Sequence, residues 1–244
     1  MSIFEEKKAI VAVSFGSSDT DAAKLLKKSA EFFEKKTGVH TFLSFTSSFA
    51  CRSLNEKSDV YIEYLPDMME KLCMLGYHDV KFVMMFLKDK AEYTKAVTEI
   101  EKYKHLFKNI SLTRPLLDSE DDLKRCIEAI KEKEAENERE LLFLIHDFSD
   151  DDKVTVTKDG DKLIPLSKIC KEKSKEDIDA LDLKNHSVKL IPLMFTFGVH
   201  AKRDIAFGEK SAAQNLKSCG YDVKVSELGL CCYDKILDMF LEKL

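Results

Sequence analysis

The stretch Ala9-Ile-Val-Ala-Val-Ser14, followed directly by Phe15-Gly-Ser-Ser18, decides the fold class of this chain. A short apolar run rich in Val and Ile is typical of a strand buried in a parallel sheet. The residues Asp19–Lys36 that follow indicate a helix, and Ser18 or Asp19 can cap its first amide groups. A strand, a polar turn and a helix in this order form the repeating unit of α/β proteins.

The same alternation continues outward from this stretch. We expect further strands at His40–Phe45, Val80–Phe86 and Ile110–Leu117, and helices after Thr46-Ser-Ser48 and at Pro66–Leu75, Lys90–Phe107 and Asp118–Glu136. The last of these helices is highly charged, which favours a solvated face and a domain boundary. Residues 1–136 are therefore predicted to form an N-terminal α/β half.

A second half, residues 137–244, follows the same plan. Strands are predicted at Glu140–His146, Val188–Met194 and Val223–Ser226, and helices at Asp204–Ser218 and Tyr233–Leu244. The closing helix could also pack back on the N-terminal half. Within Asp147–Lys175, the runs Val154–Thr157 and Lys162–Leu166 flank a Gly-containing turn and predict a hairpin.

Corresponding positions in the two halves carry polar side chains. Ser14 and His146 both end a strand; Glu92 follows Val80 by twelve residues, as His200 follows Val188. We therefore expect two similar α/β halves with parallel sheets that face a central cleft. Ligands of such sheets bind beyond the carboxyl ends of the strands, where these four residues are placed.

Composition excludes several classes of protein. The 244 residues include 39 Lys+Arg and 44 Asp+Glu, a net charge of −5 without a concentrated basic face, which argues against nucleic acid as a partner. The longest apolar runs, such as Leu190–Phe197, are too short to span a membrane. The charged residues 5–8 interrupt any signal peptide, and the seven Cys show no C-x-x-C spacing. These features predict a cytoplasmic protein with reduced, structural thiols, among which only the adjacent Cys231 and Cys232 stand out.

Two of the six histidines differ from the others. His40, His78, His105 and His186 fall at junctions or on a charged helix and are expected to be exposed surface residues. His146 and His200 each follow a strand, where they are either structural or able to bind a divalent transition metal and accept protons. The acidic residues Asp147 and Asp150–Asp152 beside His146 are either further ligands or a solvated loop.

The strand-to-helix junctions of the first half suit an anion. Backbone amides and hydroxyls there could bind a negative group, or the hydroxyls could serve only as helix caps. Arg52, one turn into the following helix, could pair with a ligand carboxylate. Nucleotide-binding, zincin and serine-hydrolase motifs are absent, so no organic cofactor is expected. The candidate substrate-binding residues are Ser14, Gly16, Ser17, Thr46, Ser47 and Arg52.

At these same residues the chain resembles the anaerobic, class II cobaltochelatases, which insert Co²⁺ into sirohydrochlorin during cobalamin synthesis. The resemblance covers almost the full length. It rests on an ordered series of segments: Val13–Ser17, Phe45–Ser47 with Arg52 and Leu54, Gly76-Tyr77 with Asp79-Val80, Glu92-Tyr93, Pro115–Leu117, the strand ending in His146, Pro192–Met194, Gly198 through His200-Ala201 to Asp204, and Leu228-Gly229.

The resemblance implies a tetrapyrrole cleft in which His146 and His200 bind the metal and accept the pyrrole protons. The metal would be a substrate, Co²⁺ in the first place, with Fe²⁺ and Ni²⁺ left open. The partner would be a tetrapyrrole of the sirohydrochlorin or precorrin-2 type, and homo-oligomer formation is left open.

The chain also departs from the family pattern. The acidic third metal ligand of the family would fall near Ile164–Leu166, where no Asp or Glu stands, and Asp147 or Glu92 could replace it. A chelatase with an altered metal site is therefore the leading prediction. The alternatives are a non-catalytic paralogue that binds tetrapyrrole or metal, and an α/β protein with an unrelated small-molecule role.

Overall fold

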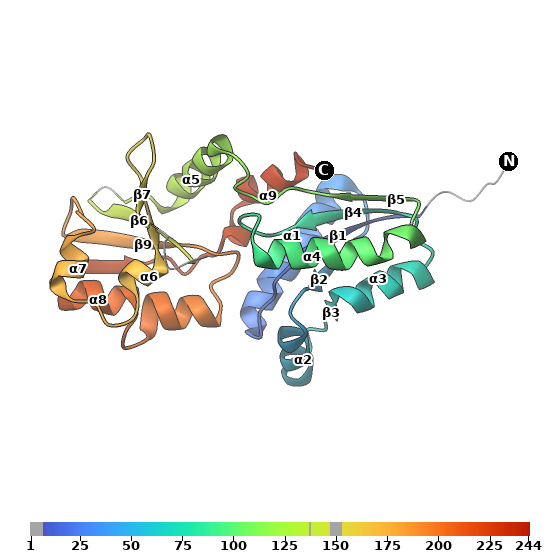
Figure 1. Ribbon diagram of the computed structural model, residues 1–244, viewed down its shortest axis with the longest axis horizontal. Helices are drawn as coiled ribbons and strands as arrows, with labels where there is room; N and C mark the ends of the chain where they lie inside the picture. The colour runs from blue at the N-terminus through green and yellow to red at the C-terminus, as the bar shows by residue number, and fades with distance from the viewer. Residues whose placement is uncertain (1–6, 137, 147–152) are drawn as a thin grey trace. The chain divides into compact units, whose positions relative to one another are not determined.

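The computed structural model describes residues 7–136, 138–146 and 153–244, which divide into two compact units. One unit holds the described residues up to Ile127 together with Tyr233–Leu244, and the other holds Glu128–Cys232. Each unit is built on its own five-stranded sheet with helices on its faces (Figure 1). The predicted α/β class, with two halves of similar design, is confirmed; the cleft stays a prediction.

The sheet of the first unit is entirely parallel, in the order β3-β2-β1-β4-β5. β1 lies in the middle, and its end is in register with that of β2, because Ser14 pairs with Phe45. The strands are β1 (Lys8–Ser14), β2 (Thr41–Phe45), β3 (Glu63–Tyr64), β4 (Asp79–Met84) and β5 (Asn109–Leu112).

Helices cover both faces of this sheet. Ala9, Val11 and Val13 of β1 pack with α3 and α4 in one apolar cluster. Alternate strand residues point to opposite faces, so Ile10 and Ala12 face the side on which α1 and α9 pack together. The helices of this unit are α1 (Thr20–Thr37), α2 (Ser48–Lys57), α3 (Leu65–Met74), α4 (Ala91–Tyr103) with the 3₁₀ turn Lys104–Leu106, and α9 (Asp234–Leu241).

Local signals explain where α1 begins and ends. The Asp19 side chain accepts a hydrogen bond from the Ala22 amide at 3.0 Å, as an N-cap should. At the other end Gly38 takes a φ of 69° and donates to the Glu34 carbonyl at 2.8 Å. The predicted helix and its cap are thus confirmed to within a residue.

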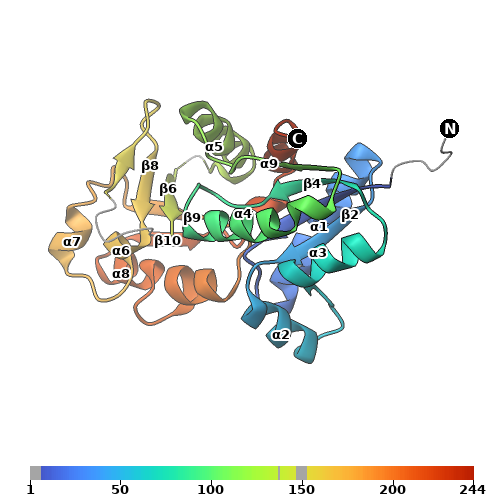
Figure 2. The ribbon, with the colours of Figure 1, turned by 45° about the vertical axis from the view of Figure 1, so that its right-hand side comes forward.

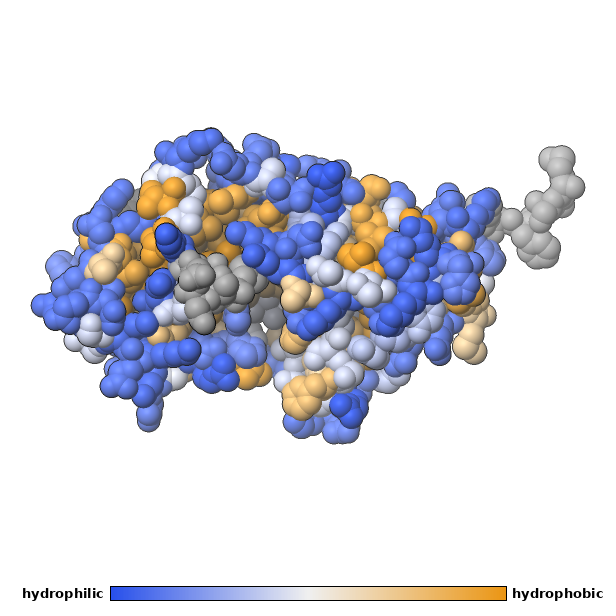
Figure 3. All heavy atoms as spheres, viewed as in Figure 1, coloured by the Kyte–Doolittle hydropathy of each residue, from blue (hydrophilic) through white to orange (hydrophobic). Residues whose placement is uncertain are grey.

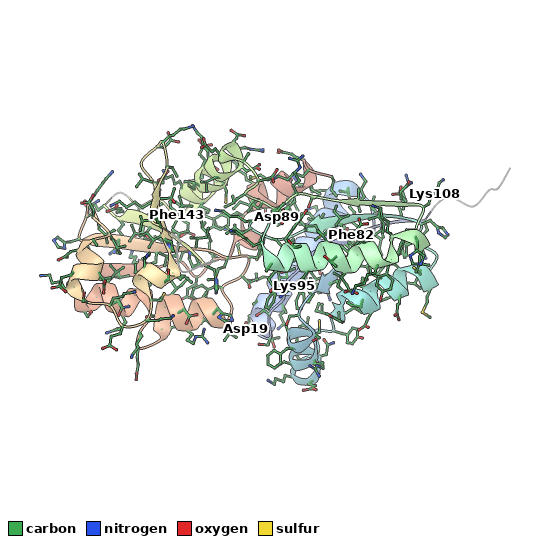
Figure 4. All side chains as sticks on the ribbon, viewed as in Figure 1. Asp19, Phe82, Asp89, Lys95, Lys108 and Phe143 are labelled. Atoms are coloured by element: carbon green, nitrogen blue, oxygen red, sulfur yellow. The ribbon has the colours of Figure 1, made fainter. Side chains whose placement is uncertain are left out.

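The second unit has the sheet order β10-β9-β6-β8-β7, in which only the short β7 is antiparallel. Phe143 of β6 is fully buried here, as Phe82 of β4 is in the first unit (Figure 4). The strands are β6 (Glu140–Ile145), β7 (Thr155–Val156), β8 (Lys162–Pro165), β9 (Ser187–Leu193) and β10 (Asp222–Val225). β7 and β8 form the predicted hairpin.

One face of this second sheet packs against a group of short helices. Leu142 and Leu144 of β6 belong to the same core cluster as Ile169, Ile205 and Leu216 of those helices. The helices are α6 (Leu166–Ile169), α7 (Lys175–Asp179), the π-helix η2 (Ala201–Phe207), α8 (Ala212–Ser218) and the 3₁₀ turn η3 (Leu230–Cys232) (Figure 2). α5 (Glu120–Glu134) contains the point at which the two units divide.

The internal repeat predicted from the spacing is present in the topology. Four strands of each sheet follow the same spatial order, 2-1-3-4, when they are numbered along the chain. These strands are β2-β1-β4-β5 in one sheet and β8-β6-β9-β10 in the other. β1 therefore corresponds to β6, and β4 corresponds to β9. In each sheet the chain order reverses between these two central strands, the place where open α/β sheets bind ligands.

Several predicted elements differ from the structure. The helix predicted at Asp204–Ser218 is wrong, because it is interrupted: η2 ends at Phe207, and α8 begins only after the Ser211 side chain caps it. The strand predicted at Ile110–Leu117 ends at Leu112, since Pro115 lacks the N–H that a ladder needs. α4 changes to a 3₁₀ turn after Tyr103, before the predicted end at Phe107.

The face of the molecule drawn in Figure 3 is mainly hydrophilic, with separate apolar patches. Among the described residues, no helix has the length and apolar character to cross a membrane.

Candidate functional site

The side chains of His146 and His200 meet at the carboxyl edge of the second sheet. His146 directly follows β6, and His200 lies at the beginning of η2, which follows the neighbouring strand β9. Their ring centroids are 6.1 Å apart with an interplanar angle of 84°, and both residues are exposed. An imidazole nitrogen binds a divalent ion at ~2 Å, so two rings that share one ion have centroids roughly 5–6.5 Å apart. The pair thus has the spacing of two ligands of one metal ion.

A guanidinium and a carboxylate lie against one nitrogen of His200. Arg203 Nη2 is 3.1 Å from His200 Nδ1, and Asp204 Oδ2 is 3.5 Å from the same atom. Arg203 also contacts both carboxylate oxygens of Asp204, Nε to Oδ1 at 2.6 Å and Nη2 to Oδ2 at 2.8 Å. The hydrogen bond from Arg203 holds the pKa of the Asp204 carboxyl below its ordinary value, against the opposing effect of burial.

The π-helical turn of η2 places these three side chains together. Its end is closed by the Gly208 amide, which donates to the Arg203 carbonyl five residues earlier at 3.1 Å. A Cβ on Gly208 would lie 2.2 Å from that carbonyl oxygen, so the approach requires glycine. π-helical turns are rare and occur frequently at functional sites.

The described residues do not complete a metal site around the two histidines. They contain no group of three or more His, Cys, Asp or Glu side chains arranged to hold a metal ion. Asp147, together with the run Asp150–Asp152, lies outside the described residues. Glu92 belongs to the first unit, where its carboxylate pairs with Lys95 at 3.0 Å, so its role as a ligand stays a prediction.

The end of β8 lies beside the strand that carries His146, and it presents no acidic side chain. β8 ends at Pro165 in register with Ile145, so Leu166 follows beside His146. Instead of a carboxylate, this segment carries Ser167, whose hydroxyl is buried without a hydrogen-bond partner among the described residues.

The candidate substrate residues of the first unit gather at the ends of β1 and β2. The Thr46 amide donates to the Ser14 carbonyl at 2.9 Å, which holds the two strand-to-helix turns together. Gly16 has a φ of 99°, and a Cβ there would lie 2.4 Å from the ring of Phe45. This position of the turn therefore requires glycine.

Most hydroxyls in these turns are already used by the backbone. The Ser47 side chain accepts from the Ala50 amide at 3.2 Å and caps α2, and Ser17 accepts from the Asp19 amide at 3.1 Å. Ser14 Oγ accepts from the Gly16 amide at 3.4 Å. Thr46 differs, because its hydroxyl is buried and has no hydrogen-bond partner among the described residues.

Thr46 and Glu92 line one cavity of about 380 Å³ in the first unit. Tyr64 and Lys95 form further parts of its wall, and Figure 4 shows Lys95 on α4. Arg52 is exposed on α2 and has no ion-pair partner among the described residues. Its guanidinium is available to a carboxylate ligand.

No role was expected for Arg203 or Asp204, or for the exposed apolar side chains of the segment that carries His200. Val199, next to His200, is 48% exposed, and Phe207 at the end of η2 is 69% exposed. The helix predicted from the sequence begins only at Asp204, so the helical spacing of three and four residues that joins His200 to Arg203 and Asp204 became visible only in the structure. No local signal distinguishes an exposed Phe207 from a core residue.

The model of the cobalt chelatase (CbiK) family matches residues 8–244 of this chain. The chain belongs to this family. The family predicted from the ordered segments is therefore confirmed, and with it the resemblance to tetrapyrrole chelatases.

A curated relative and a solved structure agree with the cobalt chelatase family. The chain is 29% identical over 129 residues to the sirohydrochlorin cobaltochelatase of Salmonella typhimurium strain LT2, across 52% of this chain and 49% of the relative. The match thus spans about half the length of that curated relative. The structure of SirB from Bacillus subtilis with Fe³⁺ has a TM-score of 0.61 at 18% identity, over 97% of this chain and 94% of that one. This likeness shows a shared fold.

Proposed function

We propose that this protein inserts a divalent metal ion into a tetrapyrrole, with Co²⁺ and sirohydrochlorin as the substrates, as in anaerobic cobalamin synthesis. The observation that carries the proposal is the exposed pair of imidazoles, 6.1 Å apart, at the reversal point of a parallel sheet. Membership of the cobalt chelatase family supports the reaction class. The Salmonella relative supports this choice of substrates.

Metal insertion needs a group that holds an ion loosely and a group that removes protons. The ring exchanges two pyrrole N–H protons for one M²⁺, so two protons must leave. A neutral imidazole can bind the ion or accept a proton near neutral pH. His146 and His200 are assigned these roles, with Asp147 and Glu92 as candidate carboxylate ligands.

The segment that carries His200 suits contact with the flat, apolar face of a large ring. Val199 and Phe207 present apolar surface on the segment that carries His200, and removing such surface from water favours binding. The carboxylates of the macrocycle are assigned to Arg52 and to the turns that contain Ser14, Gly16, Ser17, Thr46 and Ser47. The hydroxyl of Thr46 supports this assignment, because it has no partner of its own among the described residues.

A non-catalytic protein that binds tetrapyrrole or metal is the second candidate. It is favoured by one observation, that the described residues hold no third acidic ligand beside the two histidines. Such a protein would bind the ring or the ion without accelerating their combination. Fe²⁺ and Ni²⁺ are alternative substrates, because divalent ions at mixed nitrogen and oxygen sites are selected by geometry and supply.

The test is an anaerobic absorbance time course of the purified protein with sirohydrochlorin and Co²⁺, compared with a control without protein. We expect acceleration that falls by about a hundredfold in His146→Ala and in His200→Ala. His186→Ala is the matched control, since His186 is exposed in the same unit and precedes β9. This control should retain the full rate.

Two other outcomes contradict the enzyme assignment. A spectral change on binding without acceleration favours the non-catalytic candidate. Full activity in folded His146→Ala and His200→Ala proteins would remove the histidine pair from the mechanism. Parallel assays with Fe²⁺ and Ni²⁺ identify the preferred metal.

A further inference from the structure

His200 has one nitrogen engaged by charged neighbours and one that is not. Nδ1 lies 3.1 Å from Arg203 Nη2 and 3.5 Å from Asp204 Oδ2. Among the described residues, no polar contact engages Nε2 of the same ring. His200 therefore presents Nε2 to an incoming metal ion, and Nδ1 to the pair formed by Arg203 and Asp204.

We propose that Asp204 is a positioning residue for His200, which accepts the Nδ1 hydrogen and so leaves Nε2 with its lone pair for the metal. This inference rests on the proposed function, in which His200 binds the incoming ion. In this role the Asp204 carboxylate orients a metal ligand and is not a ligand itself.

The donors and acceptors around Nδ1 indicate which nitrogen carries the hydrogen. A neutral imidazole carries one hydrogen, and the nitrogen without it is the one that can bind a metal. If Nε2 is the ligand, Nδ1 carries the hydrogen and needs an acceptor. Arg203 has only donors and can hydrogen-bond Nδ1 only in the other tautomer, so Asp204 Oδ2, 3.5 Å away, is the acceptor within reach of the Nδ1 hydrogen.

The positive charge of Arg203 also needs a carboxylate beside it. A guanidinium 3.1 Å from the imidazole repels a divalent cation that approaches the same ring. Asp204 contacts this guanidinium through both oxygens and offsets its charge. Without the carboxylate, Arg203 would be the sole charged neighbour of Nδ1. As a donor it would favour the tautomer with hydrogen on Nε2, in which Nε2 has no lone pair for the metal.

Asp204 is less exposed than His200 and Arg203, and its backbone is held by a further hydrogen bond. Its side chain is 26% exposed, against 60% for His200 and 62% for Arg203. The thiol of Cys170, at the end of α6, donates to the Asp204 carbonyl at 2.9 Å. Carboxylates that orient a metal-binding histidine in this way commonly change metal affinity by about 10–100-fold when they are removed.

The test is calorimetric titration of the intact protein with Co²⁺ alone. We expect Asp204→Asn to weaken Co²⁺ binding by about 10–100-fold, and Asp204→Glu, which keeps an acceptor, to recover part of the loss. Arg203→Gln should bind Co²⁺ at least as tightly as the wild type. The double variant R203Q/D204N should bind at least about threefold more tightly than D204N, because the uncompensated guanidinium is gone. Asp179→Asn, an exposed aspartate of the same unit, is the matched control.

A second measurement does not depend on metal binding or catalysis. The ¹⁵N shifts of the His200 ring in the metal-free protein report its tautomer, and Asp204→Asn should increase the form with hydrogen on Nε2. Asp179→Asn should leave these shifts unchanged.

The outcomes separate this inference from the proposed function. Unchanged Co²⁺ affinity and unchanged His200 shifts in folded Asp204→Asn overturn the positioning role. A double variant no tighter than D204N overturns the charge argument and places the carboxylate on the metal instead. If the wild type neither binds Co²⁺ nor inserts it, the proposed function fails, while the tautomer measurement still decides whether Asp204 orients His200.

Discussion

The amide of Gly208 donates to the carbonyl of Arg203 at 3.1 Å, and this bond closes the π-helical turn beside the histidine pair. The approach is possible only because residue 208 has no side chain: a Cβ would lie 2.2 Å from the Arg203 oxygen. The position of the Arg203 and Asp204 side chains relative to His200 therefore depends on a backbone contact.

Gly208→Ala should disturb this turn and, with it, metal binding. The clash is with backbone, which cannot rotate away, so we expect a loss of about 1–3 kcal/mol in the free energy of unfolding. Co²⁺ affinity should fall by more than about tenfold as Asp204 shifts. Gly38→Ala is the control, because no atom lies within 4 Å of its added Cβ and it is expected to lower stability only. Equal Co²⁺ affinities in the two variants would show that the turn does not position the site.

Arg52→Gln should weaken the binding of the tetrapyrrole and leave the binding of the metal ion unchanged. Arg52 is exposed and has no ion-pair partner among the described residues, so removal of its charge should change the stability of the fold little. We expect KM for sirohydrochlorin to rise by about five- to tenfold, with unchanged Co²⁺ affinity and thermal stability. Steady-state kinetics with either substrate varied would measure this. A change in Co²⁺ affinity would instead place Arg52 at the metal.

Lys243 should contribute more to stability than its position next to the last residue suggests. Its ammonium donates to the Pro115 carbonyl at 2.8 Å, the Leu116 carbonyl at 3.0 Å and Asp122 Oδ2 at 2.9 Å. Burial alone would raise the pKa of the Asp122 carboxyl, but the hydrogen bond and charge of Lys243, together with hydrogen bonds to Ser119 and the Asp118 amide, lower it below its ordinary value. Lys243→Met leaves this carboxylate buried without its cation and should cost about 2–4 kcal/mol in urea unfolding.

Lys36→Met is the matched control for this variant. Lys36 links α1 to α9, through Asp238 at 3.0 Å, but its side chain is 48% exposed. An exposed pair of this kind is worth about 0.5 kcal/mol. Similar losses in the two variants would contradict the importance of burial at Asp122.

Glu136 should make the free energy of unfolding depend on pH in the acidic range. Hydrogen bonds from Lys189 and Lys224, each at 2.8 Å, lower its pKa from 4.5 to about 2, against a small opposing effect of desolvation. A carboxyl with a lowered pKa stabilises the fold fully above its unfolded pKa and loses that contribution as the pH falls through its folded pKa. The contribution of Glu136 is therefore complete at pH 6–8 and declines between about pH 4.5 and 2.

The stability difference between the wild type and Glu136→Gln should follow that window. Urea unfolding at neutral pH and at several acidic pH values should show a constant difference above about pH 5 that shrinks below it. A difference that stays constant down to pH 3 would contradict the lowered pKa.

Much of the architecture could be predicted because its signals are local. The Val- and Ile-rich run at β1, the Asp19 cap and the repeat spacing each depend on neighbours in the sequence. The topology confirms the repeat, with β1 equivalent to β6 and β4 equivalent to β9. The same signals failed at residues 204–218, where helical spacing continues across Gly208 although the backbone turns away.

The sequence by itself determined the α/β class, the ends of β1 and β2 and the two histidines that follow β6 and β9, because apolar periodicity and strand-to-helix junctions are properties of short segments. Only the tertiary structure decided that these imidazoles stand 6.1 Å apart, that Arg203 and Asp204 close on Nδ1 of His200, and that α9 packs against α1. The physical reason is that these relations depend on which strands pair and where the backbone closes, since contacts between distant segments form only when the sheet is assembled.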